Sequence, residues 1–169
     1  MSKNNLIMIG MPSSGKTTVG NLLSERTGKS FLDTDHLLQN ITGLSPKEYV
    51  DCYGLDKFLE TQEQTVLNIK VENSVIATGG GVIYSEAAME HLTKNGIVIY
   101  LKTSFEVLED RVAKDRKLAR RDGKSFHDVY LERIPLYEKC ASLIIDCNEK
   151  LSTEIADEII NIIYSGKEL

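Results

Sequence analysis

Short apolar runs alternate with amphipathic segments along most of the chain, as in a parallel sheet with helices on both faces. The apolar runs predict strands at residues 5–9, 30–33, 74–78, 96–101 and 142–146. The amphipathic segments predict helices at residues 16–27, 46–53, 56–71, 86–94, 105–115, 126–140 and 153–164. Serines are expected to cap several of these helices: Ser45, Ser85, Ser104, Ser125 and Ser152. No repeat or proline-rich linker divides the chain, so one α/β domain over residues 1–169 is predicted.

Composition narrows the classes of partner that this domain can have. A net charge of −5 argues against general binding to nucleic acid or to a membrane surface, because either would require a basic face. No apolar run approaches the length of a bilayer span, and the N-terminus enters the first predicted strand without room for a signal peptide. The three cysteines are scattered and odd in number, which indicates a reducing cytoplasm. We expect a cytoplasmic monomer that acts on a small molecule.

The segment Gly10–Thr17 satisfies the G-x-x-x-x-G-K-[ST] pattern of a phosphate-binding P-loop. It follows a buried strand and opens a helix, so the phosphates would lie against backbone N–H groups at a helix N-terminus. Lys16 would reach the β- and γ-phosphates, and the Thr17 hydroxyl would bind Mg²⁺. The predicted nucleotide contacts from this segment are Gly10, Pro12, Ser13, Ser14, Gly15, Lys16, Thr17 and Thr18. The sequence therefore predicts binding of a nucleotide with its metal ion.

Two carboxylates, Asp33 and Asp35, follow the second predicted strand. Residues two apart in an extended segment face the same way, so both carboxylates are expected to point to one side. One carboxylate near a P-loop can hold Mg²⁺, and the other can take a proton from an acceptor hydroxyl. The simpler alternative is that these residues only cap the following helix. The nearby P-loop favours the functional interpretation.

Further along the chain, two features predict the walls of an acceptor site. Residues 36–72 form a mostly helical insertion, longer than a strand–helix–strand crossover requires, although added packing alone would also explain it. Gly79, Gly80 and Gly81 follow the third strand, where the missing side chains would let the backbone approach a ligand; a tight turn is the alternative.

Basic residues are concentrated late in the chain. The run Arg111–Arg121 lies between two predicted helices, and residues 112–125 are interpreted as a lid that closes cations over the nucleotide. A solvated charged loop is the alternative. Arg133 lies in the next helix, which Pro135 is expected to break or kink.

Four motifs in order resemble the shikimate kinase family. They are the P-loop, F-x-D-x-D at Phe31–Asp35, T-G-G-G at Thr78–Gly81 and R-x-P-L-Y at Arg133–Tyr137. The resemblance covers about residues 5–164 and implies a nucleoside-monophosphate-kinase-like fold with sheet order 2-3-1-4-5. It also implies ATP- and Mg²⁺-dependent phosphorylation of a hydroxyl on a small cyclic acid, with shikimate the leading acceptor, and hence a role in aromatic amino acid biosynthesis.

The resemblance assigns roles to individual residues. Asp33 is similar to the family's metal-associated aspartate, and Asp35 to the aspartate that grips acceptor hydroxyls and acts as the base. Gly79–Gly81 resembles the loop that lines the acceptor site, and Arg133 the arginine that binds the acceptor carboxylate. Arg111 resembles a residue that stacks near adenine. Arg116 and Arg120 are the lid arginines favoured for contacting the phosphates.

Two segments depart from the family pattern. Members usually carry F-R-x-x-E in the insertion, but here Leu59 stands in for the arginine and Gln62 for the glutamate. Losing both charges together is electrostatically consistent, since either one alone would be left unpaired. This indicates a remodelled pocket in which Leu59 contacts the acceptor. The lid lacks the usual R-P-L-L and is a few residues short.

These departures keep three alternatives open. The nearest is a sibling kinase that acts on another polyol or hydroxy acid. A catalytically weak nucleotide-binding module would keep the P-loop, but it would not need the two aspartates, the glycines and Arg133 together. A nucleoside monophosphate kinase should show more arginines around its acceptor phosphate.

Overall fold

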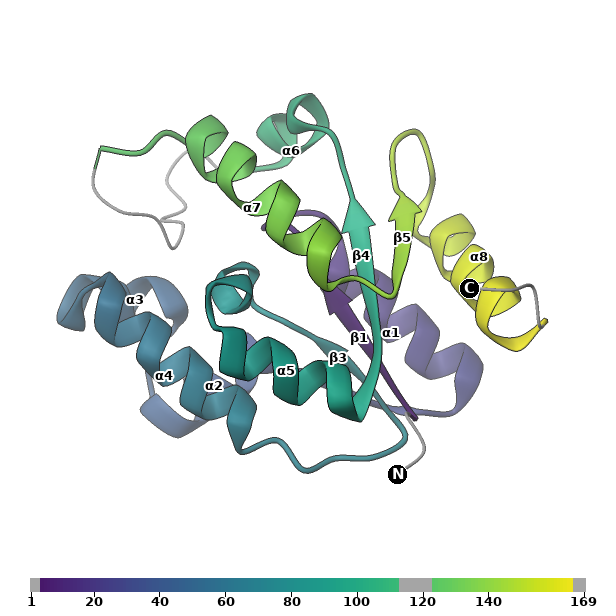
Figure 1. Cartoon of the computed structure of the whole chain (residues 1–169), viewed down its shortest axis with the longest axis horizontal. Coiled ribbons are helices and arrows are strands. Elements are labelled where there is room, and N and C mark those ends of the chain that lie inside the picture. Colours follow the sequence, from purple (N-terminus) through teal and green to yellow (C-terminus); the bar gives the residue numbers. More distant parts are fainter. Residues whose placement is uncertain (1–3, 113–122, 166–169) are drawn as a thin grey trace.

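The strands form a single parallel sheet at the centre of the computed structural model, which describes residues 4–112 and 123–165 (Figure 1). Its order is β2-β3-β1-β4-β5, which confirms the predicted topology. The strands are β1 (Asn5–Ile9), β2 (Ser30–Asp33), β3 (Ser74–Ala77), β4 (Gly96–Lys102) and β5 (Leu143–Asp146). Within one or two residues, these bounds are the ones that the apolar runs predict.

The helices likewise follow the predicted pattern, with a few differences. They are α1 (Lys16–Thr27), α2 (Thr34–Thr42), α3 (Pro46–Tyr53), α4 (Leu55–Leu67), the 3₁₀ helix η1 (Gly80–Tyr84), α5 (Glu86–Asn95), α6 (Phe105–Arg111), α7 (Phe126–Cys140) and α8 (Ser152–Tyr164). The insertion at 36–72 therefore consists mainly of α2, α3 and α4, which lie together at one side of the molecule (Figure 1). The lid residues 113–122 lie outside the described part of the chain.

Several local predictions need correction. Pro135 lies inside one continuous helix, α7, and does not break it. The helix expected to run to residue 71 ends at Leu67, and Asn68 closes it by donating its backbone N–H to Gln64. Ser104 precedes α6 but accepts no capping hydrogen bond through its side chain, and Ser152 is the first residue of α8 rather than its cap. A serine stands at both of these positions, but its hydroxyl can cap the helix only where the backbone orients it toward the free N–H groups of the first turn.

Each face of the sheet packs against its own layer of helices. Leu6 and Met8 of β1 point into an apolar cluster with α1 and α8. The alternate residues Ile7 and Ile9 point into a second cluster with α4, α5 and α7. All four side chains are almost fully buried, as expected for a central parallel strand. None of the helices in the described ranges is both long and apolar enough to span a lipid bilayer.

Asn5 links the start of β1 to the chain entering β3. Its side-chain amide donates to the Val71 carbonyl at 2.9 Å, and its amide oxygen accepts from the Ser74 N–H at 2.9 Å. Asn5 is only 2% exposed. Both bonds span more than sixty residues of sequence, so this one side chain fixes the end of the insertion against the sheet.

We expect Asn5→Ala to lower the free energy of unfolding by about 1–3 kcal/mol, because the buried Ser74 N–H would lose its partner. Chemical denaturation measures this change. Asn68→Ala is the matched control, since that side chain is exposed and donates to the Gln64 carbonyl one turn earlier in the chain. The control should cost less than about 0.5 kcal/mol. Equal effects of the two substitutions would contradict the role given to Asn5.

Candidate active site

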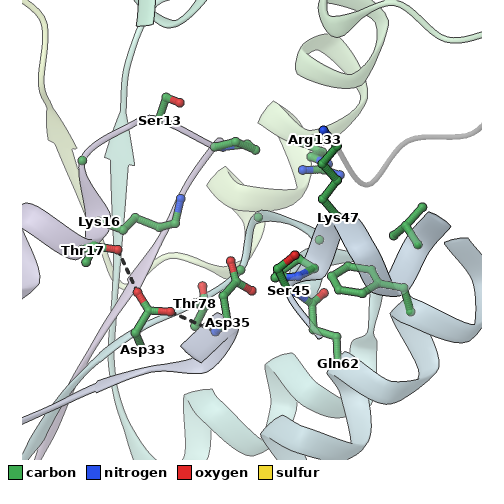
Figure 2. Close-up of a pocket in the computed structure, with 18 of the residues that line it drawn as sticks. Ser13, Lys16, Thr17, Asp33, Asp35, Ser45, Lys47, Gln62, Thr78 and Arg133 are labelled. Atoms are coloured by element: carbon green, nitrogen blue, oxygen red, sulfur yellow. Dashed lines mark hydrogen bonds between the residues drawn. The ribbon is translucent and has the colours of Figure 1, made fainter. Parts of the chain in front are cut away.

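One cavity of about 460 Å³ opens at the edge of the sheet where the strands end (Figure 2). Residues from the P-loop, β2, α2, the glycine segment and α7 line it together. The predicted site residues among its walls are Pro12, Ser13, Gly15, Lys16, Thr17, Thr18, Asp33, Asp35, Gly79, Gly80, Gly81 and Arg133. The fold thus brings together residues that are more than a hundred positions apart in sequence.

The P-loop turns sharply between β1 and α1. Gly15 has φ 94°, and Ser13 also takes a positive φ of 66°, which is uncommon for a residue with a side chain. The Lys16 Nζ donates to the carbonyls of Gly10 at 2.8 Å and Met11 at 2.7 Å. Its ammonium group is therefore held across the loop, at the place where a phosphate would meet the backbone N–H groups.

Thr17 and Asp33 form the candidate metal corner. The Thr17 hydroxyl donates to Asp33 Oδ2 at 2.8 Å, as the dashed line in Figure 2 shows. The other oxygen, Asp33 Oδ1, accepts from the backbone N–H groups of Asp35 at 2.9 Å and His36 at 3.3 Å. Asp33 therefore caps α2 and also presents an oxygen beside the P-loop hydroxyl, so the two interpretations of this residue are compatible.

The two aspartates do not share one extended segment. Asp33 ends β2, whereas Asp35 already lies in the first turn of α2. The prediction assumed that both aspartates lie in an extended strand, and this assumption is wrong. Both residues nevertheless line the cavity. The chain turns into a helix between them, so Asp33 faces Thr17 while Asp35 faces the glycine segment (Figure 2).

Gly79 packs tightly against two polar side chains of the cavity. A Cβ atom there would lie 2.3 Å from Gln62 Nε2 and 2.5 Å from Asp35 Oδ1. Its N–H donates to Thr34 Oγ1 at 2.9 Å. Gln62 is 3% exposed, and its Oε1 has no hydrogen-bond partner within the described residues. A glycine is required here by the protein's own side chains, and the buried Gln62 Oε1 is left as an acceptor without a donor among the described residues.

Arg133 is fully buried and is held by aromatic residues. Its Nε donates to the Tyr84 hydroxyl at 3.1 Å, and its guanidinium lies 4.9 Å from the centre of the Tyr84 ring. Tyr84 in turn donates to Glu132 Oε1 at 2.6 Å. Tyr137 donates to the Gly80 carbonyl at 2.8 Å, which anchors the glycine segment to α7. These contacts orient Arg133 before any ligand arrives.

The ionisation of this cluster is consistent with that arrangement. Burial raises the pKa of Tyr137 to about 12 and also raises the pKa of Tyr84, so both phenols keep their protons near neutrality. A hydrogen bond from Lys124, followed by the one from Tyr84, lowers the pKa of Glu132. The carboxylate therefore stays ionised as the acceptor at the end of the chain from Arg133 through Tyr84.

Some predicted site residues lie elsewhere. Gly10 and Ser14 do not line the cavity. Instead, the Gly10 carbonyl and the Ser14 hydroxyl each accept a hydrogen bond from the Lys16 amino group. Arg111 donates to the Ser13 carbonyl at 3.5 Å from the far side of the P-loop. Leu59 is not among the walls either; it packs against the apolar cluster of Leu38, Tyr49 and Phe58. Arg116 and Arg120 lie outside the described residues.

The cavity also has walls that sequence reasoning did not select as site residues. They are Ser45, Pro46, Lys47, Val50, Phe58, Gln62 and Thr78. Most come from α3 and α4. Phe58, Gln62 and Thr78 belong to family motifs, whereas no family motif marks the walls from residues 45–50. One signal could have pointed to Lys47. A cation in the first turn of a helix opposes the helix dipole, so helix stability does not explain a lysine at this position.

Comparisons with known proteins agree with this geometry. A family model described as shikimate kinase matches residues 12–164. The shikimate kinase of Wigglesworthia glossinidia brevipalpis is 32% identical over 170 residues, which cover 97% of this chain and 98% of that protein. A shikimate kinase of Clostridium botulinum (strain Loch Maree / Type A3) is 39% identical over 171 residues, with 97% and 96% covered. A structure of shikimate kinase from Acinetobacter baumannii in complex with shikimate superposes with a TM-score of 0.86 at 32% identity, covering 99% of this chain and 97% of that one.

We expect Gly79→Ala to destabilise the fold by about 1–3 kcal/mol, because the new methyl group must displace Gln62 and Asp35. Nucleotide affinity should be unchanged, since the P-loop is not touched. Thermal unfolding and titration with a fluorescent nucleotide measure the two effects.

Adding Gln62→Ala to Gly79→Ala tests whether the contact with Gln62 causes this loss of stability. It removes the amide that the methyl group would meet at 2.3 Å, so the double variant should lose less stability than the two single changes added together. Additive losses would show that the tight contact is not the source of the effect.

Proposed function

The chain belongs to the shikimate kinase family, and from this membership we propose that it transfers the γ-phosphoryl group of ATP to a hydroxyl of shikimate, giving shikimate 3-phosphate. One observation carries the proposal. A single cavity contains a P-loop lysine, a carboxylate suited to be a base and a buried arginine suited to bind an acid. A nucleotide-binding module would need only the first of these.

The nucleotide half of the cavity is suited to MgATP. The Thr17 hydroxyl and Asp33 carboxylate lie 2.8 Å apart and are hard oxygen donors, which Mg²⁺ prefers. Within the described residues no three His, Cys, Asp or Glu side chains form a metal cluster, which fits an ion held mainly by phosphates and water. When bound, Mg²⁺ neutralises charge on the phosphates. Lys16 would do the same at the γ-phosphate during transfer.

The acceptor half of the cavity supplies orientation. Asp35 would accept the proton of the attacking hydroxyl as its oxygen bonds to the γ-phosphorus and the bond from that phosphorus to ADP breaks. Arg133 would bind the acceptor carboxylate through its planar fork, already oriented by Tyr84. The orphaned Gln62 Oε1 would accept a hydrogen bond from another acceptor hydroxyl.

A related acceptor is the second candidate, because position 59 offers no charge and position 62 is a neutral amide. A polyol or a different hydroxy acid could use Asp35 and Gln62 without needing a second arginine. We further propose that the protein works as a cytoplasmic monomer; its cysteines, Cys52, Cys140 and Cys147, are free thiols.

The test is ADP release from MgATP in the presence of shikimate and of a panel of other hydroxy acids, polyols and sugars. We expect shikimate to give the highest kcat/KM. A higher value for another compound would replace shikimate with the second candidate. Absence of acceptor-dependent turnover across the panel would refute kinase activity on small molecules.

Lys16→Ala should abolish phosphoryl transfer while the protein remains folded. The variant loses the cation that the loop holds against the phosphates, and such losses typically reduce turnover by about 100-fold or more. Lys94→Ala is the control, since Lys94 pairs with Glu90 on the exposed face of α5. Wild-type turnover by the Lys16 variant would overturn the assignment of the P-loop.

A further inference from the structure

We propose that Lys47, on α3, is the second cation that binds the acceptor carboxylate, facing Arg133 across the cavity. This inference rests on the proposed function and adds the residue that would compensate for the missing arginine at position 59. It concerns a side chain outside every motif that the sequence displays.

The position of Lys47 supports this role. Lys47 lines the same cavity as Arg133. α3 is fixed against α4 by a hydrogen bond of 2.9 Å between the Tyr49 hydroxyl and Thr61 Oγ1. Tyr49 also packs on Phe58, with ring centres 6.3 Å apart. The backbone of Lys47 is thereby held at the cavity wall.

The local structure shows no other role for the Lys47 side chain. In the described part of the chain it forms no hydrogen bond or ion pair, whereas Lys57 and Lys94, for example, each pair with a glutamate. Its neighbour Glu48 is occupied, because its carboxylate accepts from the backbone N–H and the hydroxyl of Ser45 in a capping box. A positive charge in the first turn of α3 also opposes the helix dipole. A negative ligand in the cavity would remove that disadvantage.

The charges at the acceptor end also favour an anion. Among the described residues, the charged walls there are one carboxylate, Asp35, and two cations, Lys47 and Arg133, which together carry a net charge of +1. An acceptor with one carboxylate would neutralise it. Gln62 is uncharged and buried, so it does not compete with the ligand for Lys47. A glutamate at that position would bring the net charge to zero before the acceptor arrives.

In this proposal, the positive charge that the family pattern places on α4 is supplied by a lysine on α3 instead. Leu59 fills the apolar cluster between the helices of the insertion, where it contacts Leu38, Tyr49 and Phe58. The cation that the family pattern places at this position stands instead on the adjacent helix. A lysine binds a carboxylate as a point charge rather than through a two-donor fork, so the acceptor would be held less rigidly.

The experiment compares Lys47→Met and Lys47→Arg with wild type, using shikimate and its uncharged methyl ester as acceptors at saturating MgATP. The KM for ATP is measured separately, with ATP varied at saturating shikimate. We expect Lys47→Met to raise the KM for shikimate about tenfold or more, as for a lost charge-assisted bond, with little change in kcat or in the KM for ATP. The methyl ester should be a poor acceptor for both proteins, and equally poor. Lys47→Arg should keep most of the wild-type affinity.

Lys57→Met is the matched control, because Lys57 lies on α4 outside the cavity walls and pairs with Glu60. It should leave both acceptors unaffected. The assignment of Lys47 is overturned if Lys47→Met leaves the KM for shikimate unchanged, weakens the acid and its ester equally, or raises the KM for ATP instead. Failure of the wild-type protein to phosphorylate shikimate would refute the proposed function itself, which is a different result.

Discussion

The parallel pairing of β1 and β2 with β3 is the constraint on which the whole site depends. In this register Met8 and Asp33 both lie opposite Ala77, so three strands end at the same level. Thr78 continues the alignment by donating its backbone N–H and its hydroxyl to the Met8 carbonyl. The segments that follow these strands therefore meet at one edge of the sheet. The P-loop, the aspartates and the glycine segment are neighbours for this reason.

Much of this could be predicted because the signals are local. Short apolar runs and helical patterns gave every strand and most helix bounds, and the P-loop motif carries its own backbone geometry. The sheet order followed from the family resemblance rather than from periodicity. The P-loop motif also identified Lys16 and Thr17, and F-x-D-x-D identified Asp33; the observed contacts of these residues fit their predicted roles without testing them. Local chemistry is sufficient where a residue's partners lie within its own turn or at the end of the same strand.

The remaining features depend on contacts between distant segments. Gln62 and Gly79 meet because α4 packs against η1, and no pattern in either segment predicts that a Cβ atom at position 79 would lie 2.3 Å from the Gln62 amide. The start of α2 separates Asp33 from Asp35, which a rule for extended chains cannot anticipate. Leu59 was expected at the acceptor because of its place in a motif, yet its side chain packs into an apolar cluster. Motif position fixes where a residue stands on its helix but not which neighbour it faces.

The cavity therefore has two halves that are held by different kinds of contact. Backbone turns and strand ends fix the nucleotide half, so a substitution there disturbs the fold as well as the chemistry. Side chains from α2, α3, α4 and α7 form the acceptor half, in which Arg133 is buried and oriented by Tyr84, which donates in turn to Glu132. Charges in that half can move from one helix to the next while the sheet stays unchanged. A departure from the family motif at positions 59 and 62, both on α4, is consequently compatible with an intact kinase fold.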